Sequence, residues 1–243
     1  MKVAIVTGAS RGIGRACALR LAKDGYTTVV NYAHSATEAE TVLEEIRKNG
    51  GDGMIYKADV SNLDEVKAMM RDVGKAYGQI DVLVNNAGIV RDEYLLMLNP
   101  DTLDRCMDLN VKGYLYCAQQ AVLKMFRKKS GVIINMSSVS GILALPGQCV
   151  YSATKGAVNS MTQTMAKELA PYGIRANAVA PGFIRTEMID ALSDEKKKEY
   201  LDTVPMHRFG EADEVAGIVS MLASDTCRYM TGQILTLDGG ISL

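Results

Sequence analysis

The sequence predicts an α/β fold: a single doubly wound parallel sheet with helices on both of its faces. Short, continuously apolar runs alternate along the chain with longer segments whose apolar residues recur at the helical period. Strands buried on both faces of a parallel sheet read as such runs, and repeated right-handed strand–helix units wind the sheet doubly. A length of 243 residues is typical of one large α/β domain, 1–243, and no Pro/Ser-rich linker divides it.

The first half of the chain shows this alternation clearly. The predicted strands are Val3–Val6, Thr27–Val30, Met54–Ala58 and Val82–Val84. The predicted helices, each with the apolar residues that share one side, are Gly12–Asp24 (Ile13, Ala16, Cys17, Leu21), Thr37–Lys48 (Val42, Leu43, Ile46) and Leu63–Tyr77 (Leu63, Val66, Met70, Val73, Tyr77). An apolar stripe of this kind packs a helix against a sheet.

The second half continues the pattern. The predicted helices are Thr102–Lys128, read as one long helix, Gln148–Ala170 and Asp213–Ala223, and the predicted strands are Val132–Asn135, Arg175–Val179 and Gln233–Leu237. The region 183–210 shows neither period and is predicted to be a long irregular loop. Because a loop of that length in a compact domain is usually functional, we interpret 183–210 as a substrate lid.

Composition excludes several classes of protein. Lys plus Arg total 27 against 28 Asp plus Glu, a net charge of −1, so no broad positive field for nucleic acid exists. No run approaches the roughly 18 apolar residues that suggest a membrane span, and the amino terminus is not typical of a signal peptide. Five cysteines without a CxxC pair predict reduced thiols in a cytoplasmic protein. Two distant histidines offer no zinc spacing, so no metal is predicted.

A glycine-rich turn follows the first predicted strand. The run TGASRGIG carries Gly8, Gly12 and Gly14 into the start of a helix. Glycine lets the backbone approach a pyrophosphate, and the free N–H groups of the following helix favour that charge. A tight turn between packed elements is the alternative interpretation, but the place of this turn after the first strand of a β–α series is where a Rossmann-like dinucleotide fold needs it.

The end of the second strand favours NADPH over NADH. An NAD site usually places an acid there for the ribose 2′-OH, and the segment 31–35, Asn-Tyr-Ala-His-Ser, contains none. Arg11 in the glycine-rich turn can offer a guanidinium to a 2′-phosphate. His34 could add a hydrogen bond, or simply face solvent.

Tyr151 and Lys155 lie four residues apart at the start of a predicted helix and therefore share one face. A nearby ammonium is expected to lower the pKa of a phenol and so to suit it for proton transfer. Such a pair alone is common on helix surfaces. Here, however, Ser138 follows a predicted strand, and the Asn86 and Pro181 segments end two others at the same edge of the sheet. Asn110, a poor helix former inside a long helix, joins them as a candidate polar residue.

The motifs TGASRGIG, NNAG, YSATK and PG, with Asn110 and Ser138, resemble the short-chain dehydrogenase/reductase family over essentially the whole chain. TGASRGIGRA, LVNNAGIVRD, NVKGYLYCAQ, VAPGFIRTEM and LTLDGG are similar to its 3-oxoacyl-[acyl-carrier-protein] reductases. The resemblance implies catalysis by Asn110, Ser138, Tyr151 and Lys155, with Tyr151 as proton donor, Lys155 holding the nicotinamide ribose, and the Asn110 main chain holding a relay water.

The residues expected to bind the cofactor, NADPH/NADP, are Gly8, Ser10, Arg11, Gly12, Ile13, Gly14, Asn31, Tyr32, Ser35, Asp59, Val60, Asn86, Ala87, Gly88, Tyr151, Lys155, Pro181, Gly182, Ile184 and Thr186. Those expected to border the substrate are Ser138, Leu143, Gln148, Tyr151 and Met188.

The resemblance implies NADPH-dependent reduction of a 3-oxoacyl thioester, linked to acyl-carrier protein, in fatty-acid synthesis by a homotetramer. The basic run 124–129, which ends at Lys129, is a candidate docking patch for that acidic carrier, or a solvated helix end. A hydroxysteroid or other secondary-alcohol dehydrogenase with the same four residues is the alternative, because the apolar lid residues suit either substrate. A regulatory protein that binds NADPH without turnover is a third interpretation, which the presence of Tyr151 and Lys155 disfavours.

Overall fold

The computed structural model describes residues 1–243, apart from the side chain of Met188. Seven strands form one parallel sheet, as the sequence predicts, and their order in it is β3-β2-β1-β4-β5-β6-β9. The strands are β1 (Lys2–Val6), β2 (Tyr26–Tyr32), β3 (Gly53–Lys57), β4 (Val82–Asn85), β5 (Gly131–Met136), β6 (Ile174–Pro181) and β9 (Ile234–Leu237).

The strand order reverses at β1. Val6 at the end of β1 is in register with Val30 of β2 on one side and with Val84 of β4 on the other. The chain moves outward from β1 to β3 and then crosses back to β4. In doubly wound sheets, ligands bind in the crevice that opens at this reversal, beyond the carboxyl ends of the strands. The fold therefore directs the search for a site to the loops after β1 and β4.

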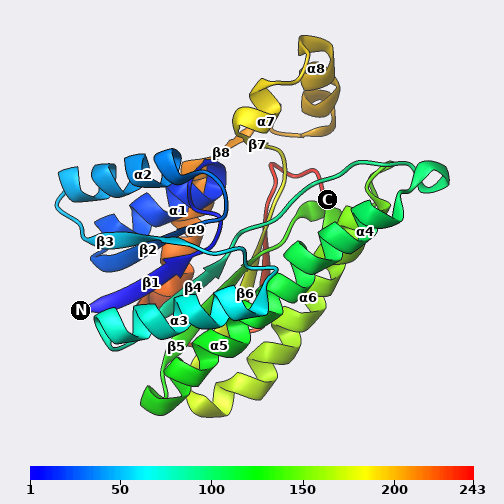
Figure 1. Cartoon of the computed structure of the whole chain (residues 1–243). Helices are drawn as coiled ribbons and strands as arrows, with labels where there is room; N and C mark the ends of the chain where they lie inside the picture. The colour runs from blue at the N-terminus through cyan, green and yellow to red at the C-terminus, as the bar shows by residue number, and fades with distance from the viewer.

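Helices cover both faces of the sheet (Figure 1). One face carries α1 (Gly12–Lys23), α2 (Ala36–Lys48) and α9 (Ala212–Ala223), and the other carries α3 (Leu63–Tyr77), α5 (Gly113–Lys128) and α6 (Cys149–Leu169). The short 3-10 turns are Leu95–Met97, Val139–Gly141, Ala170–Tyr172 and Asp225–Cys227. Each helix boundary predicted for these helices, except the start of α5, lies within one residue of the observed one.

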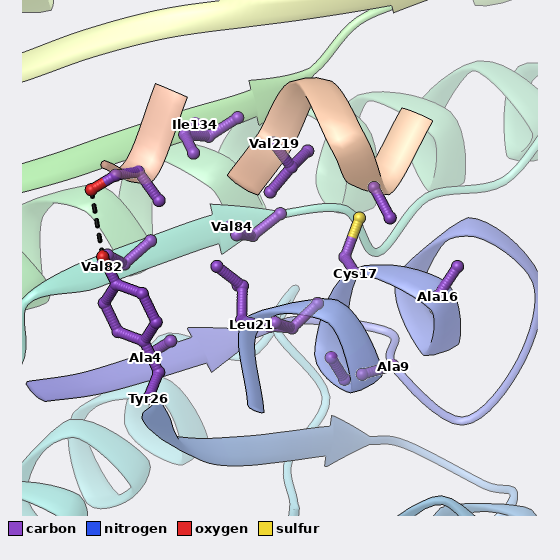
Figure 2. Close-up of a cluster of buried hydrophobic side chains, with 14 of the residues drawn as sticks. Ala4, Ala9, Ala16, Cys17, Leu21, Tyr26, Val82, Val84, Ile134 and Val219 are labelled. Carbon is purple, nitrogen blue, oxygen red and sulfur yellow. Dashed lines mark hydrogen bonds between the residues drawn. The ribbon is translucent and has the colours of Figure 1, made fainter. Parts of the chain in front are cut away.

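Apolar side chains of strands and helices interdigitate in the α1/α2/α9 layer (Figure 2). Val84 and Ile134 point from the central strands toward Leu21 of α1 and Val219 of α9, and all four side chains are fully buried. The Tyr26 hydroxyl donates a 3.0 Å hydrogen bond to the Ala223 carbonyl, which ties the start of β2 to the end of α9. This packing holds β1, β2 and β4 rigidly below the crevice.

The predicted helix 102–128 is not one regular helix. It consists of α4 (Pro100–Met107), a π-helical turn (Asp108–Lys112) and α5. In the turn, the Gly113 N–H donates to the Asp108 carbonyl, five residues back. Asn110 lies in this turn and is fully buried. A π-turn commonly marks a functional site, because one extra residue per turn re-aims the side chains that follow.

The region 183–210 is not irregular, which corrects the sequence prediction. It contains β7 (Ile184–Arg185), α7 (Glu187–Asp190), α8 (Asp194–Thr203) and β8 (Gly210–Glu211), and it projects beyond the strands (Figure 1). Parallel pairing of β7 with β8 closes its base. The Phe183 and Tyr200 rings stack at 4.4 Å, which fastens α8 to the segment after β6. The sequence missed α8 because no residue of that helix is buried and its charged sequence has no apolar stripe.

Within the described residues, the helices lack the combination of length and apolar character that crossing a membrane requires. All five cysteines are free thiols, and Cys149 alone among them is exposed.

Candidate active site

The loops after β1 and β4 are locked together at the strand-order reversal. The Thr7 side-chain oxygen accepts hydrogen bonds from the main-chain N–H groups of Asn86, at 2.9 Å, and Ala87, at 3.0 Å. In return, the Asn86 amide donates to the carbonyls of Thr7, at 3.0 Å, and Gly8, at 3.1 Å. The structure therefore brings the predicted Gly-rich turn and the NNAG segment into one rigid cradle.

Two glycines allow this close approach. Gly8 has a φ of +62°, and a Cβ there would lie 2.8 Å from the Ala87 Cα. A Cβ on Gly14 would lie 2.3 Å from the Gly8 carbonyl oxygen and 2.5 Å from the Asn86 amide nitrogen. Either contact is too short for a real side chain, so the backbone here must stay bare.

The start of α1 offers free N–H groups to an anion. Arg11 is its N-cap residue, and among the described side chains none caps α1 and none in its first turn is acidic. Gly12, Ile13 and Gly14 form that first turn, and Ser10 precedes Arg11 in the loop before it. Free N–H groups together with a bare backbone suit a diphosphate, so the residues present fit a dinucleotide cofactor.

The Asn31 side chain hydrogen-bonds to the backbone on either side of it and so supports the cradle. Its side-chain oxygen accepts from the Gly8 N–H at 3.3 Å, and its amide donates to the carbonyls of Tyr56, at 3.2 Å, and Ala58, at 3.0 Å. The amide is buried and already committed to the backbone of neighbouring strands. Asn31 therefore positions Gly8, whereas Tyr32 remains only half-buried.

The remaining residues predicted around the adenosine flank this cradle. Ser35 precedes α2 as its N-cap residue, and Val60 is buried after β3. The Asp59 carboxylate accepts hydrogen bonds from the N–H and the hydroxyl of Ser61, at 2.9 and 2.7 Å. Gly88 lies beside Asn110, whose side-chain oxygen would be 3.0 Å from a Cβ on that glycine.

The lid region contacts the cradle at two points. The Arg11 guanidinium lies 3.8 Å from the Glu187 carboxylate, and both side chains are largely exposed. The Thr186 methyl group would lie 3.6 Å from a Cβ placed on Gly12. Pro181 ends β6, Gly182 donates to the Leu237 carbonyl at 3.0 Å, and Ile184 is buried in β7. The Met188 side chain, predicted to border the substrate, lies outside the described residues.

Lys155 is buried at the carboxyl end of β5. Its ammonium donates to the Met136 carbonyl at 2.7 Å. It also lies 5.3 Å from the centre of the Tyr114 ring and 5.6 Å from the centre of the Tyr151 ring. Burial lowers the pKa of Lys155 to about 7, because the charged form loses its hydration.

Burial is also the largest influence on the pKa of Tyr151. It raises the pKa of Tyr151 to about 12, while a hydrogen bond with Ser138 acts in the opposite direction. The sequence predicted a lowered phenol pKa through Lys155, and the structure does not show it. The physical reason is that Lys155 is desolvated too: an amine with a pKa of about 7 is only partly charged at neutral pH.

Asn110 links the loop after β4 to α6. Its side-chain oxygen accepts from the Ile89 N–H at 2.9 Å, and its amide donates to the Ile89 carbonyl at 2.9 Å. The same amide donates to the Thr154 hydroxyl at 3.2 Å, which in turn donates to the Tyr151 carbonyl at 2.7 Å. The side chain of Asn110 therefore has a structural task that the sequence did not reveal.

A chain of hydrogen bonds extends from Ser138 toward solvent. The Ser138 hydroxyl donates to the Ser140 hydroxyl at 3.1 Å, which donates to the Gln148 side-chain oxygen at 2.7 Å. The Gln148 amide lies 3.4 Å from the Asp92 carboxylate. Leu143 lies in the same loop, where its N–H donates to the Val139 carbonyl at 2.7 Å.

Sequence reasoning missed four residues of this site: Ser140, Asp92, Tyr114 and Thr154. Tyr114 follows Asn110 by four residues and Thr154 follows Tyr151 by three, so helical spacing could have identified both. Asp92 left no signal, because only the folded loop brings it to Gln148.

The basic run 124–129 lies at the amino-terminal ends of the strands, opposite to the carboxyl ends where the candidate site lies. It ends α5, and Lys128 pairs with Asp81, which directly precedes β4. Lys129 follows α5 with a φ of +51°, just before β5 begins. Tyr151 instead lies by Lys155, which bonds to Met136 at the end of β5. The structure therefore does not bring Lys129 to the cleft of its own chain.

The chain is similar in sequence to known proteins. The family model described as "Enoyl-(Acyl carrier protein) reductase" matches residues 8–242. The chain is 50% identical over 240 residues to the 3-oxoacyl-[acyl-carrier-protein] reductase FabG of Staphylococcus aureus, covering 99% of this chain and 98% of that one. It is 46% identical over 241 residues to the 3-oxoacyl-[acyl-carrier-protein] reductase of Synechocystis, with coverages of 99% and 96%.

Solved structures of related proteins superpose closely on the chain. A gluconate 5-dehydrogenase from Burkholderia cenocepacia, in complex with NADP and tartrate, superposes with a TM-score of 0.94 at 37% identity, covering 99% of this chain and 95% of that one. A mutant Serratia marcescens short-chain dehydrogenase/reductase superposes with a TM-score of 0.94 at 34% identity, with coverages of 100% and 98%. With the match spanning the whole sheet and its cradle, the chain belongs to the short-chain dehydrogenase/reductase family of oxidoreductases.

Proposed function

We propose that this enzyme uses NADPH to reduce the 3-oxo group of an acyl thioester carried by acyl-carrier protein. The product is the 3-hydroxyacyl thioester, an intermediate of fatty-acid synthesis. The observation that carries the proposal is the convergence of Ser138, Tyr151 and Lys155 at the carboxyl end of β5. This strand pairs with β4, and the loop after β4 forms part of the glycine cradle. The curated relatives at 46–50% identity across the chain support this substrate class.

Ser138 and Tyr151 would act on the substrate carbonyl. The cofactor supplies a hydride to the carbonyl carbon, and the carbonyl oxygen gains negative charge as it arrives. Because the pKa of Tyr151 is raised to about 12, its phenol is protonated at neutral pH and can give its proton to that oxygen. Ser138, whose hydroxyl is close enough to Tyr151 to lower the pKa of that phenol, would hold the oxygen in line with it.

Lys155 would support the proton transfer. The phenolate left on Tyr151 would face an amine whose pKa of about 7 allows it to carry a positive charge or to release a proton near neutral pH. A cation beside a phenolate stabilises it, so the charge is not left alone in a buried site. Asn110, joined to α6 through Thr154, keeps this pair in place, and its main-chain relay role stays a prediction.

The cradle would hold the cofactor, and its charge favours NADPH. The side chain of Arg11 is free to turn from Glu187 toward a 2′-phosphate, since both side chains are largely exposed. The end of β2 carries no acid that would repel this phosphate: residues 31–35 read Asn-Tyr-Ala-His-Ser. The NADP in the gluconate 5-dehydrogenase structure supports the same choice.

The lid, residues 183–210, would cover the acyl chain. Its two ends are fastened to each other by β7 and β8, so α7 and α8 can move as a unit on a fixed base. Gln148 and Leu143 line the loop between Ser138 and Tyr151, where the substrate would pass. That Met188 borders the substrate stays a prediction.

We also propose a homotetramer in the cytoplasm. Exposed Leu115, Leu123 and Phe126 on α5 support assembly, because large apolar side chains on one helix mark an interaction surface. Five free thiols support a reducing compartment. Lys129 lies far from the cleft of its own chain, so a role in carrier docking requires the site of a neighbouring subunit.

NADPH consumption tests the activity. The purified enzyme is offered acetoacetyl-[acyl-carrier protein] and acetoacetyl-CoA, beside a keto-steroid, 5-ketogluconate and a crotonyl thioester at matched concentration. The last two are included because of the gluconate 5-dehydrogenase structure and the enoyl reductase description of the family model. We expect fast turnover of the two acetoacetyl thioesters and little of the others.

Turnover of the steroid or the ketogluconate alone would instead assign a secondary-alcohol dehydrogenase on the same catalytic groups. Turnover of the crotonyl thioester alone would assign an enoyl reductase. In each case the proposed 3-oxoacyl substrate would be wrong.

A further inference from the structure

Tyr114 is anchored at both of its ends inside the site. Its hydroxyl donates to the Met136 carbonyl at 3.2 Å. Its own carbonyl accepts from the Asn85 amide at 3.2 Å, and Asn85 also donates to Asn135 at 2.9 Å. Tyr114 is 1% exposed, so the ring has no freedom to leave this position. These bonds tie α5 to the carboxyl ends of β4 and β5.

Tyr114 and Lys155 share one acceptor. The Met136 carbonyl receives both the Tyr114 hydroxyl, at 3.2 Å, and the Lys155 ammonium, at 2.7 Å. A carbonyl oxygen has two lone pairs, so both donors can be satisfied together. The Tyr114 hydroxyl thereby fixes the orientation of the oxygen on which the ammonium rests.

The Tyr114 ring also stabilises the charge of Lys155. The ammonium lies over the ring at 5.3 Å from its centre, with the Tyr151 ring at 5.6 Å. A cation over an aromatic face is attracted by the electrons of the ring, most strongly where water is excluded. Met136 supplies the ammonium with its hydrogen bond to the protein, so the two rings supply much of the remaining compensation for lost hydration.

We propose that Tyr114 is a positioning residue for Lys155, holding the ammonium at the end of β5 and favouring its charged form. The inference rests on the proposed proton-transfer role of Lys155. Removing the ring disfavours the charged amine, so the Lys155 pKa falls and less of the amine is charged at neutral pH. The basic limb of the pH profile, where activity is lost as Lys155 deprotonates, therefore moves to lower pH.

Other titratable groups lie near Tyr114 and Tyr151, the two rings beside Lys155. Cys117 on α5 lies near Tyr114, and Cys106 on α4 and Asp92 after β4 lie near Tyr151. Burial raises the pKa of both thiols, which keeps them neutral near pH 7. Asp92 is the carboxylate of this set and raises the pKa of Tyr151. Within the described residues, none of these groups bonds to Lys155 directly, so a shift on removal of the Tyr114 ring reports the ring itself.

The test compares Tyr114→Leu and Tyr114→Phe with the wild-type enzyme. Tyr116→Leu is the matched control: Tyr116 lies on the same helix and packs instead with the cluster that includes α3. Two profiles are measured against pH for each protein. One is NADPH affinity from the emission of the cofactor, which no tryptophan of the chain obscures, and the other is kcat/KM with acetoacetyl-CoA.

We expect the basic limb of both profiles to move down by about one pH unit in Tyr114→Leu, from the loss of a desolvated cation–π contact. Tyr114→Phe keeps the ring and should leave the limb near its wild-type place, with a modest fall in kcat. Tyr116→Leu should leave the limb unchanged. If Tyr114→Leu does not fold, Tyr114→Met, which also lacks the ring, takes its place.

A folded Tyr114→Leu or Tyr114→Met enzyme with the wild-type limb would overturn the inference and reduce Tyr114 to a packing residue. The affinity profile needs no carbonyl substrate. If the wild-type enzyme turns over neither acetoacetyl-[acyl-carrier protein] nor acetoacetyl-CoA, a shifted affinity limb in Tyr114→Leu would refute the proposed substrate while supporting the role of Tyr114.

Discussion

The Lys155 ammonium donates a 2.7 Å hydrogen bond to the main-chain carbonyl of Met136, the last residue of β5. A lysine four residues beyond Tyr151 is thereby held at the carboxyl edge of the sheet, where the cradle also opens. The same burial that places it there makes its charge costly and lowers its pKa to about 7. Stability and proton transfer therefore depend on the same side chain.

The first prediction concerns the pH dependence of stability. The pKa of Lys155 is about 7 in the folded protein and 10.5 in the unfolded chain, so the unfolded chain binds more protons between those values. The free energy of unfolding should therefore rise with pH across this window. From pH 7 to 9, Lys155 contributes a rise of about 2 kcal/mol that Lys155→Met should lack. Urea unfolding of both proteins at the two pH values measures this. If the free energy of unfolding depended on pH equally in the wild type and in Lys155→Met, the lowered pKa of Lys155 would be contradicted.

The second prediction separates chemistry from cofactor binding. Tyr151→Phe removes the proton donor and keeps the ring, so turnover should fall by about 10²–10⁴. NADPH affinity should change little, because the cradle and Lys155 stay in place. Steady-state kinetics and cofactor emission measure the two quantities. Near-normal turnover would show that another group protonates the carbonyl.

The third prediction concerns Arg11 and its partner on the lid. Arg11→Ala should weaken NADPH binding by about 10- to 100-fold, as expected for losing a hydrogen-bonded charge, and NADH binding much less. Glu187→Gln should act in the opposite direction and tighten NADPH binding by about two- to fivefold, because an exposed pair 3.8 Å apart competes only weakly with the 2′-phosphate. The dissociation constants of NADPH and NADH, measured for the wild-type enzyme and both variants, test these two expectations. Equal effects on NADH and NADPH would remove the case for 2′-phosphate recognition.

The fourth prediction concerns the Asn110 clamp, the three hydrogen bonds that the Asn110 side chain makes with Ile89 and Thr154. Asn110→Ala leaves the N–H and the carbonyl of half-buried Ile89 without their partner and should lower the free energy of unfolding by about 1–3 kcal/mol. Thr154→Val removes the third hydrogen bond of the clamp together with the bond from the Thr154 hydroxyl to the Tyr151 carbonyl. It leaves both bonds to Ile89 in place and should therefore cost less. Chemical denaturation ranks the two variants. A larger loss in Thr154→Val would mean that the link to α6, rather than the loop after β4, depends on this asparagine.

The fifth prediction tests the bare backbone of the cradle. A Cβ on Gly14 would meet the Gly8 carbonyl oxygen at 2.3 Å, so Gly14→Ala should weaken NADPH binding at least about tenfold. Gly217 on α9 is the matched control, because its nearest neighbour would be 3.9 Å from the new Cβ. Gly217→Ala should keep NADPH affinity and gain about 0.5–1 kcal/mol of stability as a helical alanine. Unchanged NADPH affinity in Gly14→Ala would refute the close approach.

The strand–helix alternation could be predicted because each element carries its own local pattern. Strands such as β2 are buried on both faces, and α3 has one apolar side, so each reads directly from the sequence. The helix α8 could not be predicted in this way, since it stands away from the sheet and buries none of its residues. The poor helix former Asn110 marked this place in the sequence, but the π-turn itself could not be predicted, because it accompanies bonds to a loop 21 residues away in the chain.

The sequence alone determined the order of the elements, the glycine cradle and the identity of the four candidate catalytic residues. Only the tertiary structure decided that burial, not Lys155, dominates the pKa of Tyr151, and that Tyr114 and Met136 surround the lysine. It also placed Lys129 at the edge of the sheet opposite to Tyr151. Spacing along a chain records which residues share an element, whereas hydration and charge depend on what other elements cover them. The chemistry of this site therefore depends on packing between segments far apart in the sequence.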